Sequence, residues 1–111
     1  MICDRFDVVA IPHPISAPTG RRPALALTVR GLNQSQGHTV FAMITSAATT
    51  PWPGDIPLAD LVSAGLPAAS VVRLKLFTLD NAVPAARLGS LAKKDAKAVR
   101  RALRAALGED E

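Results

Sequence analysis

Short apolar runs alternate with polar or proline-rich connections along the chain, which predicts a protein built mainly of β-strands. Three largely apolar runs, at 6–11, 24–29 and 39–45, have the length of single strands. A fourth and longer run, 70–80, alternates with a period of two, as a half-buried strand does. These four runs are the predicted strands.

The connections carry turn-forming residues. Prolines and Gly20 predict an irregular loop at 12–20, and the glycine-bounded polar stretch 31–37 predicts an exposed hairpin loop. Two prolines and a glycine break the pattern again at 50–55, which holds the only tryptophan, Trp52. The next segment, 56–62, predicts a short strand or a turn of helix.

The last part of the chain predicts an amphipathic helix. Its apolar residues recur at alternating four- and three-residue steps, and the set is Ala92, Ala96, Val99, Leu103 and Leu107. Ser90 is a candidate N-cap, and Gly108 a stop signal. Most of the lysines and arginines in this segment lie off the apolar stripe, which is typical of a solvated helix face.

Composition narrows the class of protein. A chain of 111 residues, 49% of them hydrophobic, supplies one core, so we expect a single domain over 1–111. The net charge of +4 favours a polyanion or an acidic protein as partner. Cys3 is the only cysteine, and no apolar run approaches the roughly 20 residues of a membrane span. The N-terminus lacks the order of a signal peptide, so we expect a cytoplasmic protein with no membrane partner.

Four positions are candidates for anion binding. Arg22 precedes Pro23, which favours extended backbone before it and predicts that the guanidinium is held at the mouth of a strand. Thr45 and Ser46 end a strand, where hydroxyls bind phosphate or cap a turn. Arg73 and Lys75 share one strand face, opposite Val72, Leu74 and Leu76, and such a pair lines a phosphate-binding surface or is simply solvated. Trp52 stacks on a base or covers the core.

The order of these features resembles the MazF/PemK-like toxins of bacterial type II toxin-antitoxin systems. The resemblance runs from Phe6 to Leu107 and rests on Pro12, Arg22-Pro23-Ala24-Leu25, Ile44-Thr45-Ser46, Ala64-Gly65-Leu66, Ser70-Val71-Val72-Arg73, Leu79-Asp80 and Leu88-Gly89-Ser90-Leu91. It implies a mainly β fold, a small SH3-like barrel at about 5–90 with a C-terminal helix at about 91–107, assembled as a homodimer. It also implies a metal-independent, cofactor-free endoribonuclease that cuts single-stranded RNA and is held inactive by a small antitoxin.

The implied chemistry uses the ribose 2′-hydroxyl as nucleophile and leaves a 2′,3′-cyclic phosphate and a 5′-hydroxyl. By the resemblance, Arg22 and Thr45 are the catalytic residues. The substrate-binding residues would be Arg21, Ser46, Arg73 and Lys75. An acidic antitoxin segment is expected to dock across Arg22, Arg73 and Lys75. The loops 12–20 and 47–55 are expected to select the RNA sequence.

The chain departs from the family pattern at two positions of the proton relay. Thr19 and Gly20 stand where some members have a histidine, and His13 lies outside that motif. Lys75 stands where some members have an acidic residue, so the general base is unassigned. Two alternatives therefore stay open: a non-catalytic toxin of the CcdB type, which poisons DNA gyrase, and an inactive member that only binds its antitoxin.

Overall fold

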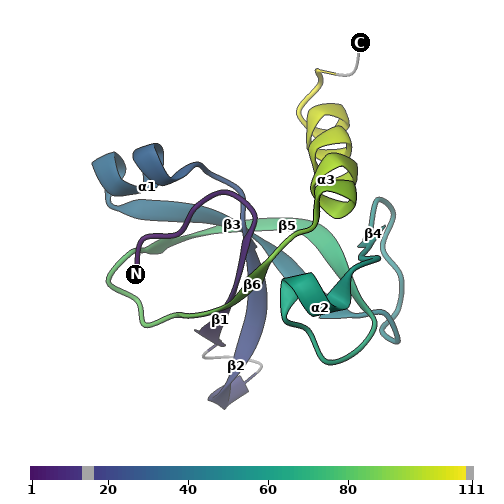
Figure 1. Ribbon diagram of the computed structural model, residues 1–111, viewed down its shortest axis with the longest axis horizontal. Coiled ribbons are helices and arrows are strands. Elements are labelled where there is room, and N and C mark those ends of the chain that lie inside the picture. The colour runs from purple at the N-terminus through teal and green to yellow at the C-terminus, as the bar shows by residue number, and fades with distance from the viewer. Residues whose placement is uncertain (14–16, 110–111) are drawn as a thin grey trace.

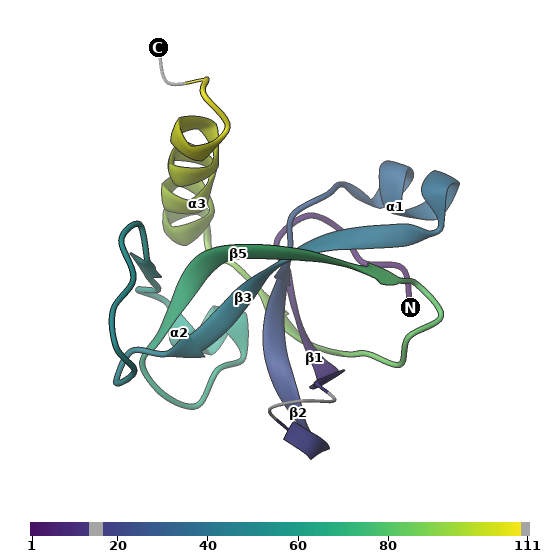
Figure 2. The ribbon, with the colours of Figure 1, turned by 180° about the vertical axis from the view of Figure 1, so that it is seen from behind.

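The computed structural model describes residues 1–13 and 17–109, and of residues 13 and 17–19 it describes the backbone alone. Within these residues six strands form one antiparallel sheet in the order β4-β5-β3-β2-β1-β6. The strands are β1 (Asp7–His13), β2 (Ala17–Ala26), β3 (His38–Ser46), β4 (Ile56–Pro57), β5 (Ser70–Asp80) and β6 (Ala86–Ser90). The helices are α1 (Arg30–Gln36), α2 (Leu61–Ala64) and α3 (Lys93–Ala106). The sheet curls, and β1 and β2 extend away from α3 (Figures 1 and 2).

The long ladder between β3 and β5 contains an irregularity that bends the sheet. Ala42 pairs with Leu76, but the next residue of β3, Met43, pairs with Arg73. Residues 74–75 of β5 therefore have no partner in β3 and form a bulge, which increases the local twist. Since an insertion of two residues restores the alternation of faces, Arg73 keeps to the face predicted from the period of two.

Apolar side chains are buried on both faces of the sheet, in two separate clusters. The larger cluster packs against α3 through Ala96, Val99 and Leu103. The other cluster includes Cys3 and Phe41. Along β2, Leu25 belongs to the first cluster, and Ala24 and Ala26 to the second. Burial on both faces explains why this segment is almost continuously apolar, and burying Leu25 alone stabilises the fold by roughly 1.5–3 kcal/mol.

Residues 31–37 do not form the expected hairpin loop. They belong to α1, which ends at Gly37 in the left-handed conformation with φ 84°. The helix is held by Asn33, which is fully buried and donates from Nδ2 to the carbonyls of Cys3 (2.8 Å) and Thr28 (2.9 Å). Its residue types have low helix propensity, so the tertiary bonds of Asn33, which are invisible in the local pattern, decide the outcome.

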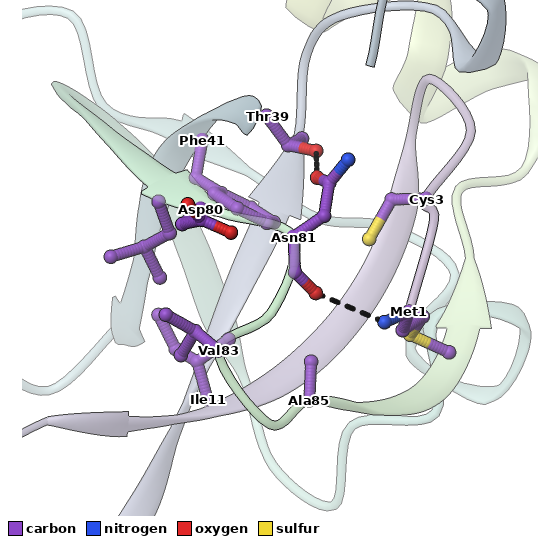
Figure 3. Close-up of a pocket in the computed structure, with 10 residues that line it drawn as sticks. Met1, Cys3, Ile11, Thr39, Phe41, Asp80, Asn81, Val83 and Ala85 are labelled. Atoms are coloured by element: carbon purple, nitrogen blue, oxygen red, sulfur yellow. Dashed lines mark hydrogen bonds between the residues drawn. The ribbon is translucent and has the colours of Figure 1, made fainter. Parts of the chain in front are cut away.

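Asn81 closes the same end of the molecule. Its Oδ1 accepts a hydrogen bond from Thr39 (2.9 Å), and its carbonyl accepts one from the N-terminal amine of Met1 (3.1 Å), as Figure 3 shows. Its Nδ2 donates to the carbonyl of Asn33 (2.8 Å). The cavity beside it measures about 10 Å³, which is room for a single water at most. This cavity is therefore a packing defect and not a substrate site.

Two predicted boundaries were wrong. β2 begins at Ala17 and ends at Ala26, so much of the expected loop at 12–20 and the start of the expected strand at 24–29 form one longer strand. Arg22 accordingly lies inside β2 and not at its mouth. Residues 14–16 of that loop lie outside the described residues.

The predicted C-terminal helix is present as α3, but Ser90 does not cap it. Ser90 is the last residue of β6 and pairs with Asp7, while the N-cap of α3 is Ala92. The buried Asp95 in its first turn accepts the backbone N–H groups of Ala59 and Asp60, both at 2.9 Å. This carboxylate fastens α3 to the connection between β4 and α2. None of the helices in the described residues is long and apolar enough to cross a membrane.

Two glycines let the backbones of α2 and β6 touch. A Cβ on Gly65, whose φ is +71°, would lie 2.1 Å from the carbonyl oxygen of Leu88. A Cβ on Gly89 would lie 2.3 Å from the carbonyl oxygen of Ser63. Because both obstacles are backbone atoms, the two elements would have to separate to admit a methyl group.

We predict that Gly89→Ala lowers the free energy of unfolding by roughly 1–3 kcal/mol, because a methyl group overpacks this contact. Gly31→Ala is the matched control, since a Cβ there meets nothing within 4 Å. As Gly31 lies within α1, alanine should raise stability by about 0.5–1 kcal/mol. Urea unfolding of both variants measures the difference, and equal stabilities would show that the α2–β6 contact yields freely.

Candidate functional site

Arg22 stands beside an opening in the sheet that Pro23 creates. Arg22 pairs with Ile11 of β1 on one side of β2. On the other side, the ladder with β3 reaches only as far as Ala24 opposite Met43, because Pro23 has no N–H to continue it. A pocket of about 200 Å³ lies at this point. It is lined by Ile11, Arg22, Pro23, Met43, Ile44, Lys75, Leu76 and Phe77.

Thr45 follows the same register. Extending the pairing of Ala24 with Met43 by two residues aligns Arg22 with Thr45, and directly opposed residues of antiparallel strands point to one face. Thr45 is buried, and its partner on β5 is Val71. The structure thus puts both predicted catalytic residues on the sheet face away from α3. Only Arg22 lines the pocket itself.

Arg73 is buried and already paired. Its Nε and Nη2 donate to the two carboxylate oxygens of Asp55, at 3.1 and 2.9 Å, and Nη2 also donates to the carbonyl of Thr50 at 3.0 Å. This bidentate geometry is the strongest form of such a pair. The hydrogen bonds from Arg73 lower the pKa of Asp55, with a further contribution from the N–H of Trp52. Arg73 thus holds the loop 47–55 against β5. Its contact with RNA stays a prediction.

Trp52 is the residue that the sequence patterns left undecided. It is 46% exposed, so it does not cover the core. The guanidinium carbon of Arg73 lies 4.5 Å from its ring centroid, and Nζ of Lys75 lies 5.7 Å from it. Asp55 accepts its backbone N–H at 3.0 Å. Since Lys75 also lines the Arg22 pocket, it connects that pocket with an aromatic surface fixed at four points.

The family model for the PemK-like, MazF-like toxins of type II toxin-antitoxin systems matches residues 4–107. The chain belongs to this family. Its fold is similar to that in the crystal structure of MazE-MazF (form II) from Deinococcus radiodurans, with a TM-score of 0.77, 23% identity and 97% of both chains covered. The predicted fold class is therefore confirmed as a curled half-barrel with a C-terminal helix.

Two mycobacterial structures share the MazF-like fold. An endoribonuclease in complex with its cognate antitoxin, from a mycobacterial species, has a TM-score of 0.74 at 18% identity, over 96% of this chain and 94% of the other. The Mycobacterium tuberculosis toxin MazF-mt6 has a TM-score of 0.73 at 21% identity, over 95% of this chain and 99% of the other. No curated protein matches the sequence of this family member.

Ser46 and Arg21 have local structural partners in this MazF-like toxin. The hydroxyl of Ser46 accepts the N–H of Ala48 at 3.1 Å, and its carbonyl accepts the hydroxyl of Thr49 at 2.8 Å, so Ser46 caps the turn after β3. Arg21 alternates to the face opposite Arg22 and donates to the carbonyl of Ala10 at 3.4 Å. Substrate binding by either residue stays a prediction.

The toxin shows no acidic residue among those that line the Arg22 pocket. The side chains of His13 and Thr19, where the family relay was sought, lie outside the described residues. The described site therefore consists of two cations, a buried hydroxyl and an apolar floor. Such a set binds a phosphate and offsets negative charge that develops on it, and it leaves the general base unassigned.

We predict that acid releases the Trp52 loop. Because the folded-state pKa of Asp55 is lowered, its stabilising contribution is complete above the ordinary aspartate pKa of about 3.9 and is lost as pH falls through the lowered value. Trp52 is the only tryptophan, so its fluorescence reports the loop directly. The emission should be constant at neutral pH and change only below about pH 3.9.

Two variants test the assignment. Asp55→Asn should show the released emission already at neutral pH. Asp60→Asn is the control, because Asp60 also has a lowered pKa, through its bonds to Ser63 in α2, but has no bond to the loop. If Asp55→Asn had the neutral emission of the unmodified protein, the ion pair would not be what holds Trp52.

Proposed function

We propose that this toxin is an endoribonuclease that cuts single-stranded RNA by attack of a ribose 2′-hydroxyl on the adjacent phosphorus. The observation that carries the proposal is Arg22 at an open pocket, aligned by strand register with Thr45 on the same sheet face. The family membership and the mycobacterial structure titled as an endoribonuclease support it.

Arg22 offsets the charge of the reacting phosphate. As the 2′-oxygen bonds to phosphorus and the bond to the 5′-oxygen breaks, negative charge grows on the nonbridging oxygens. The planar, permanently charged guanidinium donates two parallel hydrogen bonds to such oxygens. Thr45, aligned with it, donates from its hydroxyl to the same phosphate. The 2′-hydroxyl proton passes to a base, and the 5′-oxygen leaves with a proton, so the products are a 2′,3′-cyclic phosphate and a 5′-hydroxyl.

Lys75 and Trp52 bind the RNA on either side of that phosphate. Lys75 lines the Arg22 pocket and lies against the Trp52 ring, so it spans the distance from phosphate to aromatic surface. Trp52, held by Arg73 and still 46% exposed, offers a face for a nucleobase. A second hollow of about 290 Å³ joins Trp52 to Ser46 and gives the base room beside the catalytic strand.

A small acidic antitoxin is the proposed regulator. The proposal is supported by the family description, which is that of a toxin-antitoxin system, and by the complexes of the similar Deinococcus and mycobacterial proteins with MazE or a cognate antitoxin. The net charge of +4 suits an acidic partner. The homodimer stays a prediction, and sedimentation of the purified protein measures it.

We predict that Arg22→Ala lowers kcat for RNA cleavage by about 10²- to 10³-fold, the usual loss when a donor to the developing charge is removed. The assay incubates the protein with a long single-stranded RNA in EDTA and maps the product ends, which should be cyclic phosphates and 5′-hydroxyls at a recurring sequence.

Arg21→Ala is the matched control, because it removes the same charge one residue away on the opposite face. Its activity should stay close to that of the unmodified protein. An equal loss in both variants would mean that general charge, and not the position of Arg22, matters. If the folded, antitoxin-free protein cut no RNA, the non-catalytic alternatives would take the place of this proposal.

We predict that Trp52→Ala raises KM for RNA and leaves kcat nearly unchanged, because stacking on a base contributes about 1–3 kcal/mol to binding. Trp52→Phe should restore most of the affinity, since a ring remains. Steady-state kinetics on one short substrate separates the two constants. A fall in kcat with unchanged KM would assign Trp52 to the reaction step and contradict the stacking role.

A further inference from the structure

A second groove lies between α3 and the sheet, on the face opposite Arg22. Its volume is about 340 Å³. Leu27, Val40 and Leu103 form its floor, and Leu76 and Leu107, which are 44% and 67% exposed, stand at its rim. A soluble protein rarely leaves leucines this exposed around a groove unless something covers them.

Three arginines surround this groove. Arg5 and Arg100 hold their guanidinium carbons 4.7 and 5.7 Å from the centre of the Phe6 ring, and Arg104 lies one helical turn beyond Arg100. Phe6 has a φ of 71°, which is unusual for an aromatic residue. Its N–H bonds to Ala26 at 2.7 Å and keeps the ring in this position. We call these three residues the arginine cluster.

The charges of the arginine cluster are not balanced within the described residues. The ion pairs found there join Arg73 to Asp55 and Arg87 to Asp7, and neither involves the cluster. Burial, followed by the charges of Arg100 and Arg104, lowers the pKa of Arg5. Mutual repulsion of this kind is relieved by any anionic group that enters the groove.

The groove meets the Arg22 pocket at one residue. Leu76 lines both cavities. In the described residues β4 pairs with β5 only at Val71 and Val72, so the later part of β5 is a free edge of the sheet. A chain that leaves the groove across this edge at Leu76 enters the pocket of Arg22.

We propose that the groove between α3 and the sheet binds an acidic, leucine-containing segment of the antitoxin, anchored by Arg5, Arg100 and Arg104, which then crosses the β5 edge at Leu76 and blocks the Arg22 pocket. The identity of the partner rests on the proposed function, whereas the binding surface does not. An RNA strand fits the groove poorly, because its floor is aliphatic and the Phe6 ring is covered by two guanidinium groups.

The test uses a fluorescein-labelled synthetic peptide that repeats the unit Glu-Leu-Glu-Leu, with a Gln-Leu-Gln-Leu peptide as the uncharged probe. Anisotropy measures the binding of each to the full-length protein. The doubly substituted Arg100→Glu, Arg104→Glu protein should bind the acidic peptide at least about tenfold more weakly, because two charge contacts turn repulsive. Arg100→Gln, Arg104→Gln, which keeps the size of the side chains closer to native, should show a smaller loss.

Lys93→Glu, Lys94→Glu is the matched control, since it makes the same change of charge at exposed positions of the same helix. It should bind the acidic peptide nearly as the unmodified protein does. Equal losses in both charge-reversal variants, or equal binding of the acidic and uncharged peptides, would overturn the proposal. So would loss of binding to a single-stranded RNA in place of the peptide, or a change of oligomeric state in the Arg100, Arg104 variant without peptide.

Cleavage assays separate this proposal from the proposed function. The acidic peptide should inhibit RNA cleavage by the unmodified protein, while the Arg100→Glu, Arg104→Glu protein should cut normally and resist inhibition. Peptide binding by a protein that cuts no RNA would support the surface and contradict the ribonuclease. Cleavage by a protein that fails to bind the peptide would contradict the surface alone.

Discussion

The register between β3 and β5 is the constraint on which the candidate site depends. It keeps Ala42 opposite Leu76 and Met43 opposite Arg73, with the two extra residues of β5 accommodated as a bulge. A shift by one residue would exchange the two faces of β5 and expose its buried valines. Because hydrophobic burial holds this register, it also determines where the charged side chains of the strand lie.

Burying Arg73 is costly unless its donors are satisfied, and the structure satisfies them in a way that creates a surface. Asp55 and the carbonyl of Thr50 accept its hydrogen bonds, and the remaining flat face of the guanidinium supports Trp52. One buried charge thus stabilises a loop and presents an aromatic ring. Substrate contact is left to the exposed neighbour Lys75.

The sheet divides stability from chemistry. The face covered by α3 contains the larger apolar cluster, whereas the other face opens where Pro23 ends the ladder between β2 and β3. Since Leu76 lies at a free edge, it is accessible from both sides. This arrangement lets a single ligand engage a groove on one face and a pocket on the other without any change in the fold.

The amino-acid sequence by itself determined the elements whose patterns are local: the alternating strand β5 at 70–80 and the amphipathic α3, whose periods of 2.0 and 3.6 follow directly from backbone geometry. Order along the chain also identified the family and the residues Arg22 and Thr45. Only the tertiary structure decided that α1 is a helix, because Asn33 is held by carbonyls outside it, and that Arg73 supports Trp52, because Asp55 lies 18 positions away. Contacts between distant segments leave no periodic trace, so their outcome depends on how the whole sheet packs.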